Sequence, residues 1–373
     1  MRVALVVPGS LDAASGGFAY DRALVDGLRA AGETVRVVSI PWRRYPLGVV
    51  DSLVPRRLFS SKFAPDVVLA DELAHPALLG RCTDLGTPDA APVVALVHHL
   101  RCDAVDGLDA TVARTLERRF LDRCDAAVCT SRPTAESVER RASGLRTHVA
   151  PPADAQFDPN VTAADVGRRA RRDPFRVAFV GNLLPRKGIL ALLDALAGLD
   201  EPWLATLVGA HPDETHLRRV RERIRRRGLG DRVHIAGSLS TDETAAVLRE
   251  SHVFAMPSAH EGFGIAYLEA MGFGLPAVAS ASGGASDLVD DSTGVLVAPG
   301  DVGGVREALA GFAADRDRLA AAGRAALDRY EVHPPWSETV AGVRRFLREV
   351  VDRHDAGDGG FPRAETPPAG RGS

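Results

Sequence analysis

Cysteine is scarce in this chain, and its spacing excludes two kinds of site. The four cysteines are Cys82, Cys102, Cys124 and Cys129, and no two of them stand in a C-x-x-C arrangement. Such a sparse set lacks both the dense disulfide framework of small secreted domains and the paired spacing of a structural zinc site. Neither a zinc site nor a disulfide scaffold is therefore expected.

Long apolar runs and metal-binding motifs are also missing. No run of about 18 apolar residues occurs, and the apolar stretch after Arg2 is too short for a signal peptide. H-E-x-x-H is absent, and the one D-x-D, from Asp315 to Asp317, lies in a helical pattern. We therefore expect a cytoplasmic protein that requires neither a metal nor another cofactor.

The charges are nearly balanced, and lysine is almost absent. The formal net charge is −3, with 25% charged and 45% hydrophobic residues, which is ordinary for a soluble protein and argues against a general nucleic-acid binder. Lys62 and Lys187 are the only lysines, so a lysine inside a motif stands out. The length of 373 residues favours two domains over one core.

Two glutamates, Glu261 and Glu269, flank a glycine-rich loop that is expected to open a helix. An apolar strand, Val253 to Met256, precedes the loop, and another, Leu275 to Ala279, follows the helix. This order places ligand-binding groups at the carboxyl ends of a parallel sheet. With helical spacing throughout, the glutamates would stand about 12 Å apart along the axis. That is roughly the span from the hexose to the ribose of a nucleotide sugar.

The backbone of this loop suits a diphosphate. Gly262, Phe263 and Gly264 would leave N–H groups free at a helix N-terminus, where the helix dipole also favours an anion. Two glutamates at this spacing are, on their own, usually solvated side chains of a helix surface. The glycine loop between two apolar strands favours a binding site, in which one glutamate holds the sugar and the other the ribose.

The stretch from Pro257 to Gly284 reads P-S-A-H-E-G-F-G-I-A-Y-L-E-A-M-G-F-G-L-P-A-V-A-S-A-S-G-G. It closely resembles the E-x(7)-E signature of retaining glycosyltransferases of family four, and the resemblance extends over nearly the whole chain. It implies an α/β fold of the GT-B type, in which two Rossmann-like domains face a central cleft and a C-terminal helix crosses back to the N-terminal domain. It also implies a hexosyltransferase that moves a sugar from a nucleotide-diphosphate donor to a hydroxyl acceptor with retention, without a metal.

The alternation of apolar strands and amphipathic helices divides the chain into five parts. The polar, arginine-rich segment from Asp158 is predicted to be a linker, and the last segment is predicted to be disordered because it is rich in glycine, proline and arginine. The predicted parts are the N-terminal acceptor-binding domain 1–157, the linker 158–174, the C-terminal nucleotide-sugar-binding domain 175–335, the crossover helix 336–353 and the tail 354–373.

In the N-terminal domain the candidate residues follow two predicted strands. Gly16 and Gly17 come after the first strand; a Gly-Gly pair alone is as often a plain turn, but the resemblance implies a loop that approaches the donor phosphate and the acceptor. A predicted strand from Pro92 to Val97 ends at His98 and His99, where a side chain points into the ligand crevice of a parallel sheet. The resemblance implies that His98, rather than His99, contacts the reacting sugar.

In the C-terminal domain a second set follows the strand that ends at Gly181. Arg186 and Lys187 stand at a helix start, where cations suit a leaving diphosphate. The resembling family usually has a basic residue just after the glycine and a lysine five residues further on. Lys187 matches that lysine, whereas Asn182 departs from the first basic position, so Arg186 is expected to supply the missing charge. The resemblance also places Leu239 near the nucleotide base.

The resemblance implies a division of roles among these residues. Glu261 would hold hydroxyls of the donor sugar, Glu269 the ribose, and His98 would orient the sugar from the opposite domain. No second carboxylate is placed for a covalent intermediate, so same-face attack assisted by the leaving phosphate is expected. A second departure is Asp287, where the family generally has glutamate. The donor is expected to be a UDP- or GDP-sugar.

Two other functional classes stay open at this point. A GT-B epimerase or phosphorylase would depend on free sugar or phosphate rather than on an acceptor, and a non-catalytic nucleotide-sugar-binding protein would share the architecture. The segment from Pro41 to Phe63 mixes basic and apolar residues. It is interpreted either as a lining of the acceptor cleft or as a patch for peripheral contact with the inner face of a membrane.

Overall fold

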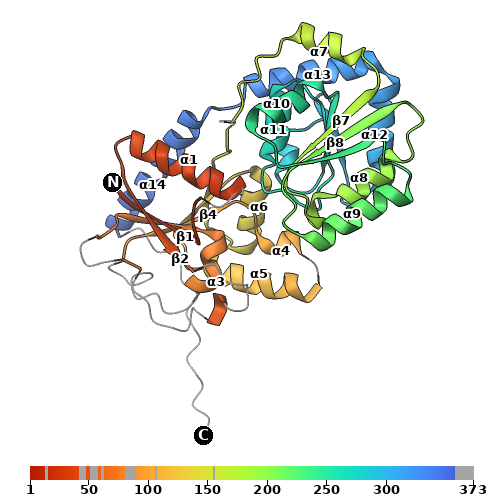
Figure 1. The fold of residues 1–373 in the computed structure, drawn as a ribbon. Helices are drawn as coiled ribbons and strands as arrows, with labels where there is room; N and C mark the ends of the chain where they lie inside the picture. Colours follow the sequence, from red (N-terminus) through yellow and green to blue (C-terminus); the bar gives the residue numbers. More distant parts are fainter. Residues whose placement is uncertain are drawn as a thin grey trace.

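The computed structural model contains two α/β domains, each built on a parallel sheet of six strands (Figure 1). The structure describes residues 1–12, 16–41, 48–50, 58–59, 63–79, 90–105, 107–153 and 156–357. The α/β fold class expected from the sequence is confirmed. Most of the basic and apolar segment 41–63 lies outside the described residues. Among the helices that are described, none is long and apolar enough to cross a membrane.

The N-terminal sheet has the strand order β2-β1-β3-β4-β5-β6, and its strands all pair in parallel. Its strands β3, β4 and β5 are buried along their whole length because helices cover both faces, which explains their continuous apolar sequence. The strands are β1 (Arg2–Pro8), β2 (Thr34–Ile40), β3 (Val67–Asp71), β4 (Val93–Val97), β5 (Ala126–Cys129) and β6 (Arg146–Val149). The helices are α1 (Gly16–Ala30), η1 (Glu72–Ala74), α3 (His75–Leu78), α4 (Arg101–Ala104), α5 (Gly107–Leu121) and α6 (Arg132–Arg141).

The C-terminal sheet has the order β12-β11-β10-β7-β8-β9, and it encloses one large core. Its strands are β7 (Phe175–Val180), β8 (Trp203–Val208), β9 (Val233–Gly237), β10 (Val253–Met256), β11 (Ala277–Ser280) and β12 (Gly294–Val297). Its helices are α7 (Ala163–Ala170), η2 (Pro185–Lys187), α8 (Ile189–Leu196), α9 (Glu214–Arg226), α10 (Thr241–Glu250), α11 (Ile265–Gly272), η3 (Gly284–Asp287), α12 (Val302–Ala314) and α13 (Arg316–Glu331).

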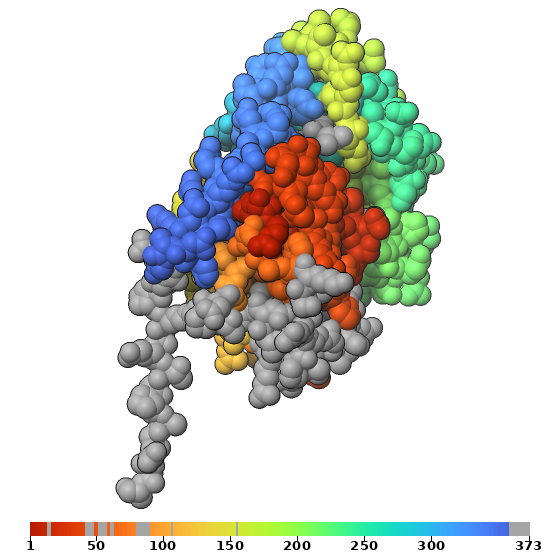
Figure 2. All heavy atoms as spheres, turned by 90° about the vertical axis from the view of Figure 1, so that its left-hand side faces the viewer, coloured from red at the N-terminus to blue at the C-terminus, as the bar shows by residue number. Residues whose placement is uncertain are grey.

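The last helix, α14 (Trp336–Asp355), returns to the N-terminal domain as expected. Figure 2 shows it lying along α1, and Val343 and Phe346 belong to the core on that face of the N-terminal sheet. Arg344 and Arg348 both bind the buried Glu33 carboxylate, which fixes the helix to the turn before β2. The helix continues two residues beyond the predicted end at 353, and residues 358–373 lie outside the described part.

Helix α7 occupies the central half of the predicted linker 158–174. Thr162 and Asp165 form a reciprocal capping box at the helix start. Arg169 is buried and donates to the carbonyl oxygens of Phe273 and Gly274 at 2.9 and 2.7 Å. The sequence of this segment resembles a polar linker because it is rich in arginine. One of these arginines, Arg169, binds backbone carbonyl groups inside the domain and is not solvated.

Candidate functional site

The two domains touch through loops at the carboxyl ends of their strands. Gly262, after β10, lies so close to the His98 carbonyl oxygen that a Cβ atom on Gly262 would stand 2.2 Å from it. Ser131 Oγ donates to the Gly262 carbonyl at 2.7 Å, and the Arg132 N–H donates to Asp287 at 2.7 Å. The loops predicted to bind the donor and the loop that carries His98 therefore meet at one interface.

Glu261 and Lys187 form a buried ion pair on the C-terminal side of this interface. Lys187 Nζ stands 2.7 Å from Glu261 Oε1, and Arg186 Nη1 stands 3.5 Å from the same oxygen. Burial alone would raise the pKa of Glu261, but the two cations hold it below its usual range. Burial lowers the pKa of Lys187 against the attraction of Glu261. The three charges leave one excess cation, which suits a diphosphate.

A close backbone approach brings Lys187 to Glu261. Gly188 ends η2 with a φ of 73°, and a Cβ atom there would stand 1.9 Å from the Pro257 carbonyl oxygen, so only glycine fits. The Ala259 N–H donates to the Arg186 carbonyl at 2.7 Å. The loop after β7 is thereby fixed against the loop after β10, and the paired charges come from both.

The glycine-rich loop has the geometry expected of an anion site. Gly264 has a φ of 88° and directly precedes α11, whose Tyr267 ring occupies the space that a Cβ atom would need. In the described part of the chain the N–H groups of residues 262–264 donate to no protein acceptor. Phe263 is buried beside them and packs near His333.

The remaining predicted donor-site residues lie at the same edge of the C-terminal sheet. Gly181 directly follows β7, and Leu239 is half-buried in the loop after β9. Glu269 is half-buried in the second turn of α11. Their positions agree with one ligand-binding edge, while the individual roles predicted for them stay predictions.

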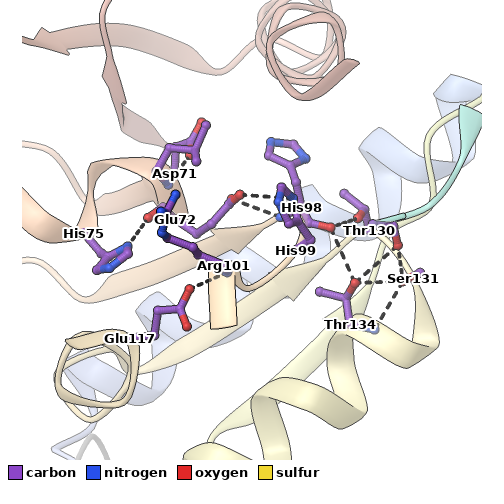
Figure 3. A network of polar contacts seen from close by, with 12 residues as sticks. Asp71, Glu72, His75, His98, His99, Arg101, Glu117, Thr130, Ser131 and Thr134 are labelled. Atoms are coloured by element: carbon purple, nitrogen blue, oxygen red, sulfur yellow. Dashed lines mark hydrogen bonds and ion pairs between the residues drawn. The ribbon is translucent and has the colours of Figure 1, made fainter. Parts of the chain in front are cut away.

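His98 is held at the end of β4 by acidic groups of the N-terminal domain. Its Nε2 stands 3.0 Å from Asp21 Oδ1. Its backbone N–H donates to Glu72 Oε2 at 3.0 Å (Figure 3). Burial alone would lower the pKa of His98, but Asp21 and Glu72 together raise it to about 10. The side chain is therefore an imidazolium at neutral pH. Gly17 packs against this ring: a Cβ atom there would lie 3.2 Å from it, closer than an ordinary van der Waals contact.

Gly16 and His99 have different surroundings from the adjacent residues Gly17 and His98. Gly16 begins α1, and a Cβ atom there would meet nothing within 4 Å. The His99 ring lies 6.1 Å from the His260 ring across the domain interface. Burial, and then the charge of Arg186, lower the pKa of His99 to about 4. His99 is therefore neutral, in contrast to His98.

Three acidic residues around His98 were not predicted from the sequence. Asp21 lies on α1, and Asp71 and Glu72 end β3 and begin η1, all of them buried. Burial, and then the charge of Glu72, raise the pKa of Asp71 well above its usual range. Burial raises the pKa of Glu72 to about 7. The available signal was the Asp-Glu pair after an apolar strand adjacent to the one that ends at His98.

Comparison with solved structures defines the class of the fold. The chain superposes with a TM-score of 0.76 on sucrose-phosphate synthase from Thermosynechococcus elongatus, at 21% identity over 94% of this chain and 99% of that one. It also matches the Anabaena HepE protein in complex with UDP-glucose, with a TM-score of 0.70 and 18% identity over 94% and 100% of the two chains. The two sheets, the central interface and the returning helix are those of the GT-B fold.

Sequence comparison then identifies the family. Residues 164–329 match the family model of glycosyl transferases group 1, and the C-terminal domain of this chain belongs to that family. The chain is 32% identical over 260 residues to a GDP-mannose-dependent alpha-(1-6)-phosphatidylinositol monomannoside mannosyltransferase of Mycobacterium tuberculosis. It is 33% identical over 256 residues to a D-inositol 3-phosphate glycosyltransferase of Xylanimonas cellulosilytica. These matches cover 64% of this chain and span 65% and 60% of the two relatives.

Proposed function

We propose that this protein is a retaining, metal-independent hexosyltransferase that transfers a sugar from a nucleotide-diphosphate sugar to a hydroxyl acceptor. The observation that carries the proposal is the buried contact of Lys187 with Glu261, 2.7 Å long, directly beside the loop that meets His98 from the other domain. An excess cation, a carboxylate and an imidazolium at one interface suit the binding and departure of a diphosphate.

The reaction forms one bond and breaks one at the anomeric carbon. The acceptor oxygen bonds to that carbon, the carbon–oxygen bond to the diphosphate breaks, and its electron pair leaves with the phosphate. Arg186, Lys187 and the amides of residues 262–264 stabilise the charge that develops there. Glu261 holds sugar hydroxyls, and Glu269 holds the ribose.

The acceptor proton goes to the departing phosphate oxygen. His98 is a poor base for it, since the neighbouring acids raise the His98 pKa to about 10 and the ring already carries its proton. Attack on the face from which the phosphate leaves gives retention. His98 then acts as a donor that orients the sugar as the domains close.

The donor class is a UDP- or GDP-sugar. Names of the relatives support it, because one matched mannosyltransferase is GDP-mannose-dependent and a solved protein of this fold was seen with UDP-glucose. The acceptor is a hydroxyl of a glycan, a glycolipid or a small molecule. We place the enzyme in the cytoplasm with peripheral contact to the inner membrane face, and liposome co-sedimentation at background across lipid compositions would remove that contact.

A donor screen tests the proposal. Thermal shift and slow hydrolysis are measured with UDP-, GDP-, ADP- and dTDP-sugars in EDTA for the wild type, Lys187→Ala and Glu269→Ala. We expect one nucleotide class to stabilise the wild type and be hydrolysed, with both effects lost in the two variants. Arg225→Ala, on the exposed face of α9, is the matched control and should respond like the wild type. No shift with any nucleotide sugar, or equal responses from all variants, would show that the donor site assigned here is wrong.

A further inference from the structure

A cluster of buried acids lies behind His98, away from the donor-binding loop. Asp21 and Asp71 are fully buried, and one carboxylate oxygen of each lies within 4.8 Å of the other and of a ring nitrogen of His98. Asp21 Oδ1 is engaged by His98, and Asp71 Oδ1 accepts from the Leu73 N–H at 2.7 Å. The second oxygens of both aspartates are buried, and neither has a hydrogen-bond donor in the described part of the chain.

The number of protons in this cluster follows from its charges. Two ionised aspartates and an ionised Glu72 would place three negative charges around a single imidazolium in a site without solvent. Like charges this close cannot all stay ionised, and the cheapest remedy is a proton on one carboxyl group, which then donates to the other. A proton shared between the two carboxyl groups would give both unpartnered aspartate oxygens a partner.

We propose that Asp21 and Asp71 form a proton-sharing carboxyl pair that keeps His98 protonated and fixes its ring with Nδ1–H toward the cleft. Asp21 is then a positioning residue, since it acts through His98 and not on the substrate. The direction of the raised Asp71 pKa is consistent with the proton residing there. This inference rests on the proposed function in one respect: the proposed function identifies the group that the His98 imidazolium faces as the donor sugar or its phosphate.

The orientation of the ring follows from which nitrogen is occupied. Nε2 is held by Asp21, while Nδ1 makes no hydrogen bond within the described residues and is not enclosed. The side chain keeps 11% exposure, and Nδ1 is the ring nitrogen that Asp21 does not occupy. A charged N–H at Nδ1 gives a donor sugar or its phosphate a charge-assisted hydrogen bond from the N-terminal domain.

Other ionisable groups also lie near His98. Tyr20, from α1, contacts the ring edge-to-face at 5.2 Å between centroids, and burial raises its pKa beyond the working range. Glu72 faces the His98 backbone and also lies 4.0 Å from His99 Nδ1. From the C-terminal domain, Arg186 acts on the neighbouring His99, which it helps to keep neutral.

The test is a pH titration of the full chain labelled with ¹⁵N-histidine, with the His98 signal assigned from His98→Gln. In the wild type the imidazolium signal of His98 should persist from pH 6 to pH 9, because a raised pKa keeps the proton bound until pH rises through about 10. In Asp21→Asn the transition should fall toward about 6.5, the ordinary value for histidine. Asp71→Asn should behave like the wild type, since its amide N–H replaces the shared proton.

Activity gives the second readout with the donor identified above. Asp21→Asn should lose kcat by about tenfold per pH unit above 6.5 with little change in KM, whereas Asp71→Asn should keep the wild-type profile. If His98 of the wild type titrates near pH 6.5, the proposal is wrong, whatever the variants of Asp21 and Asp71 show. Stabilisation by Zn²⁺ or Mn²⁺ that is reversed by EDTA and lost in Asp71→Asn would also overturn it. If the titration behaves as expected but no sugar is transferred, the proposed function fails and the carboxyl pair stands.

Discussion

At the residue scale, the candidate site at the domain interface contains charges that are paired with one another. Glu261 is the common partner of Lys187 and Arg186, so a diphosphate that enters would draw the cations while the carboxylate stays available for sugar hydroxyls. For the lysine the cost of burial outweighs the attraction of the glutamate, whereas for the glutamate the attraction of two cations outweighs its burial. The three side chains therefore carry one net positive charge, which would stabilise a leaving phosphate.

Glu261→Gln tests this pairing. The change leaves Lys187 buried without an anionic partner, so we expect the free energy of unfolding to fall by about 3 kcal/mol. We expect kcat to fall by about 100-fold, a magnitude usual for the loss of one preorganised electrostatic group. Urea unfolding and steady-state kinetics measure the two effects. Glu222→Gln, on the exposed surface of α9, should change neither.

The pair also predicts a pH dependence with a definite sign. Because the pKa of Glu261 is lowered in the folded protein, its stabilisation is present above about 4.3, the usual glutamate value, and is lost as pH falls through the lowered value. The difference in unfolding free energy between wild type and Glu261→Gln should therefore shrink on acidification. A difference that grows at low pH would contradict the assigned charges.

At this scale, the sequence predicts those site residues whose type is explained by their local context. Glu261 and Gly262 lie in the loop after β10, and Lys187 lies at a helix start, where the pattern itself indicates a ligand edge. Asp21 lies in the middle of an amphipathic helix, where an aspartate is ordinarily solvated. Its burial depends on His98, 77 residues away in the chain, and no periodicity reports such a pairing.

At the element scale, many strands and helices followed from apolar runs and helical spacing, whereas α7 lies inside a segment that was predicted to be a linker. Its polarity reflects Arg169, whose guanidinium binds the carbonyl oxygens at the end of α11 and so attaches the helix to the domain. Burial lowers the pKa of Arg169 to about 10, so the side chain keeps its charge at neutral pH. Element boundaries in this fold thus depend on tertiary hydrogen bonds as much as on propensity.

Arg169→Met measures this attachment. The substitution keeps the length of the side chain but leaves two buried carbonyl groups without their charged donor, so we expect a loss of about 2 kcal/mol in the free energy of unfolding. Thermal or urea unfolding gives the value. Arg171→Met is the control, since Arg171 forms an exposed ion pair with Asp317 and should cost far less. Equal effects of both substitutions would show that α7 is held by its apolar face alone.

At the scale of the whole molecule, the proposed function depends on the contact between two domains, each with its own core. The interface joins the His98 carbonyl, Gly262 and Ser131, and a side chain on Gly262 would push the two loops apart. The separate cores explain why the fold class could be predicted from the sequence. The geometry of the interface could not be predicted, because the only sequence feature that accompanies a close approach of two backbones is a glycine.

Gly262→Ala should separate binding from catalysis. Each domain keeps its own core, so we expect the melting temperature and donor affinity to change little, while transfer falls by about 100-fold because His98 no longer meets the donor loop in the productive position. Calorimetry, donor titration and kinetics give the three values. Gly230→Ala is the matched control, because a Cβ atom there would meet nothing within 4 Å. If donor affinity fell as much as activity, the substitution would instead be acting on the binding of the diphosphate by residues 262–264.

The most direct test of the account is a ¹H NMR time course of the wild type with its donor in EDTA, with Glu261→Gln run in parallel. From an α-linked nucleotide sugar the account predicts that nucleoside diphosphate and an α-configured product accumulate together in the wild type and not in the variant. A β-configured product would contradict retention. Absence of nucleoside diphosphate release, or equal release by Glu261→Gln, would contradict the assignment of this cleft as the site of sugar transfer.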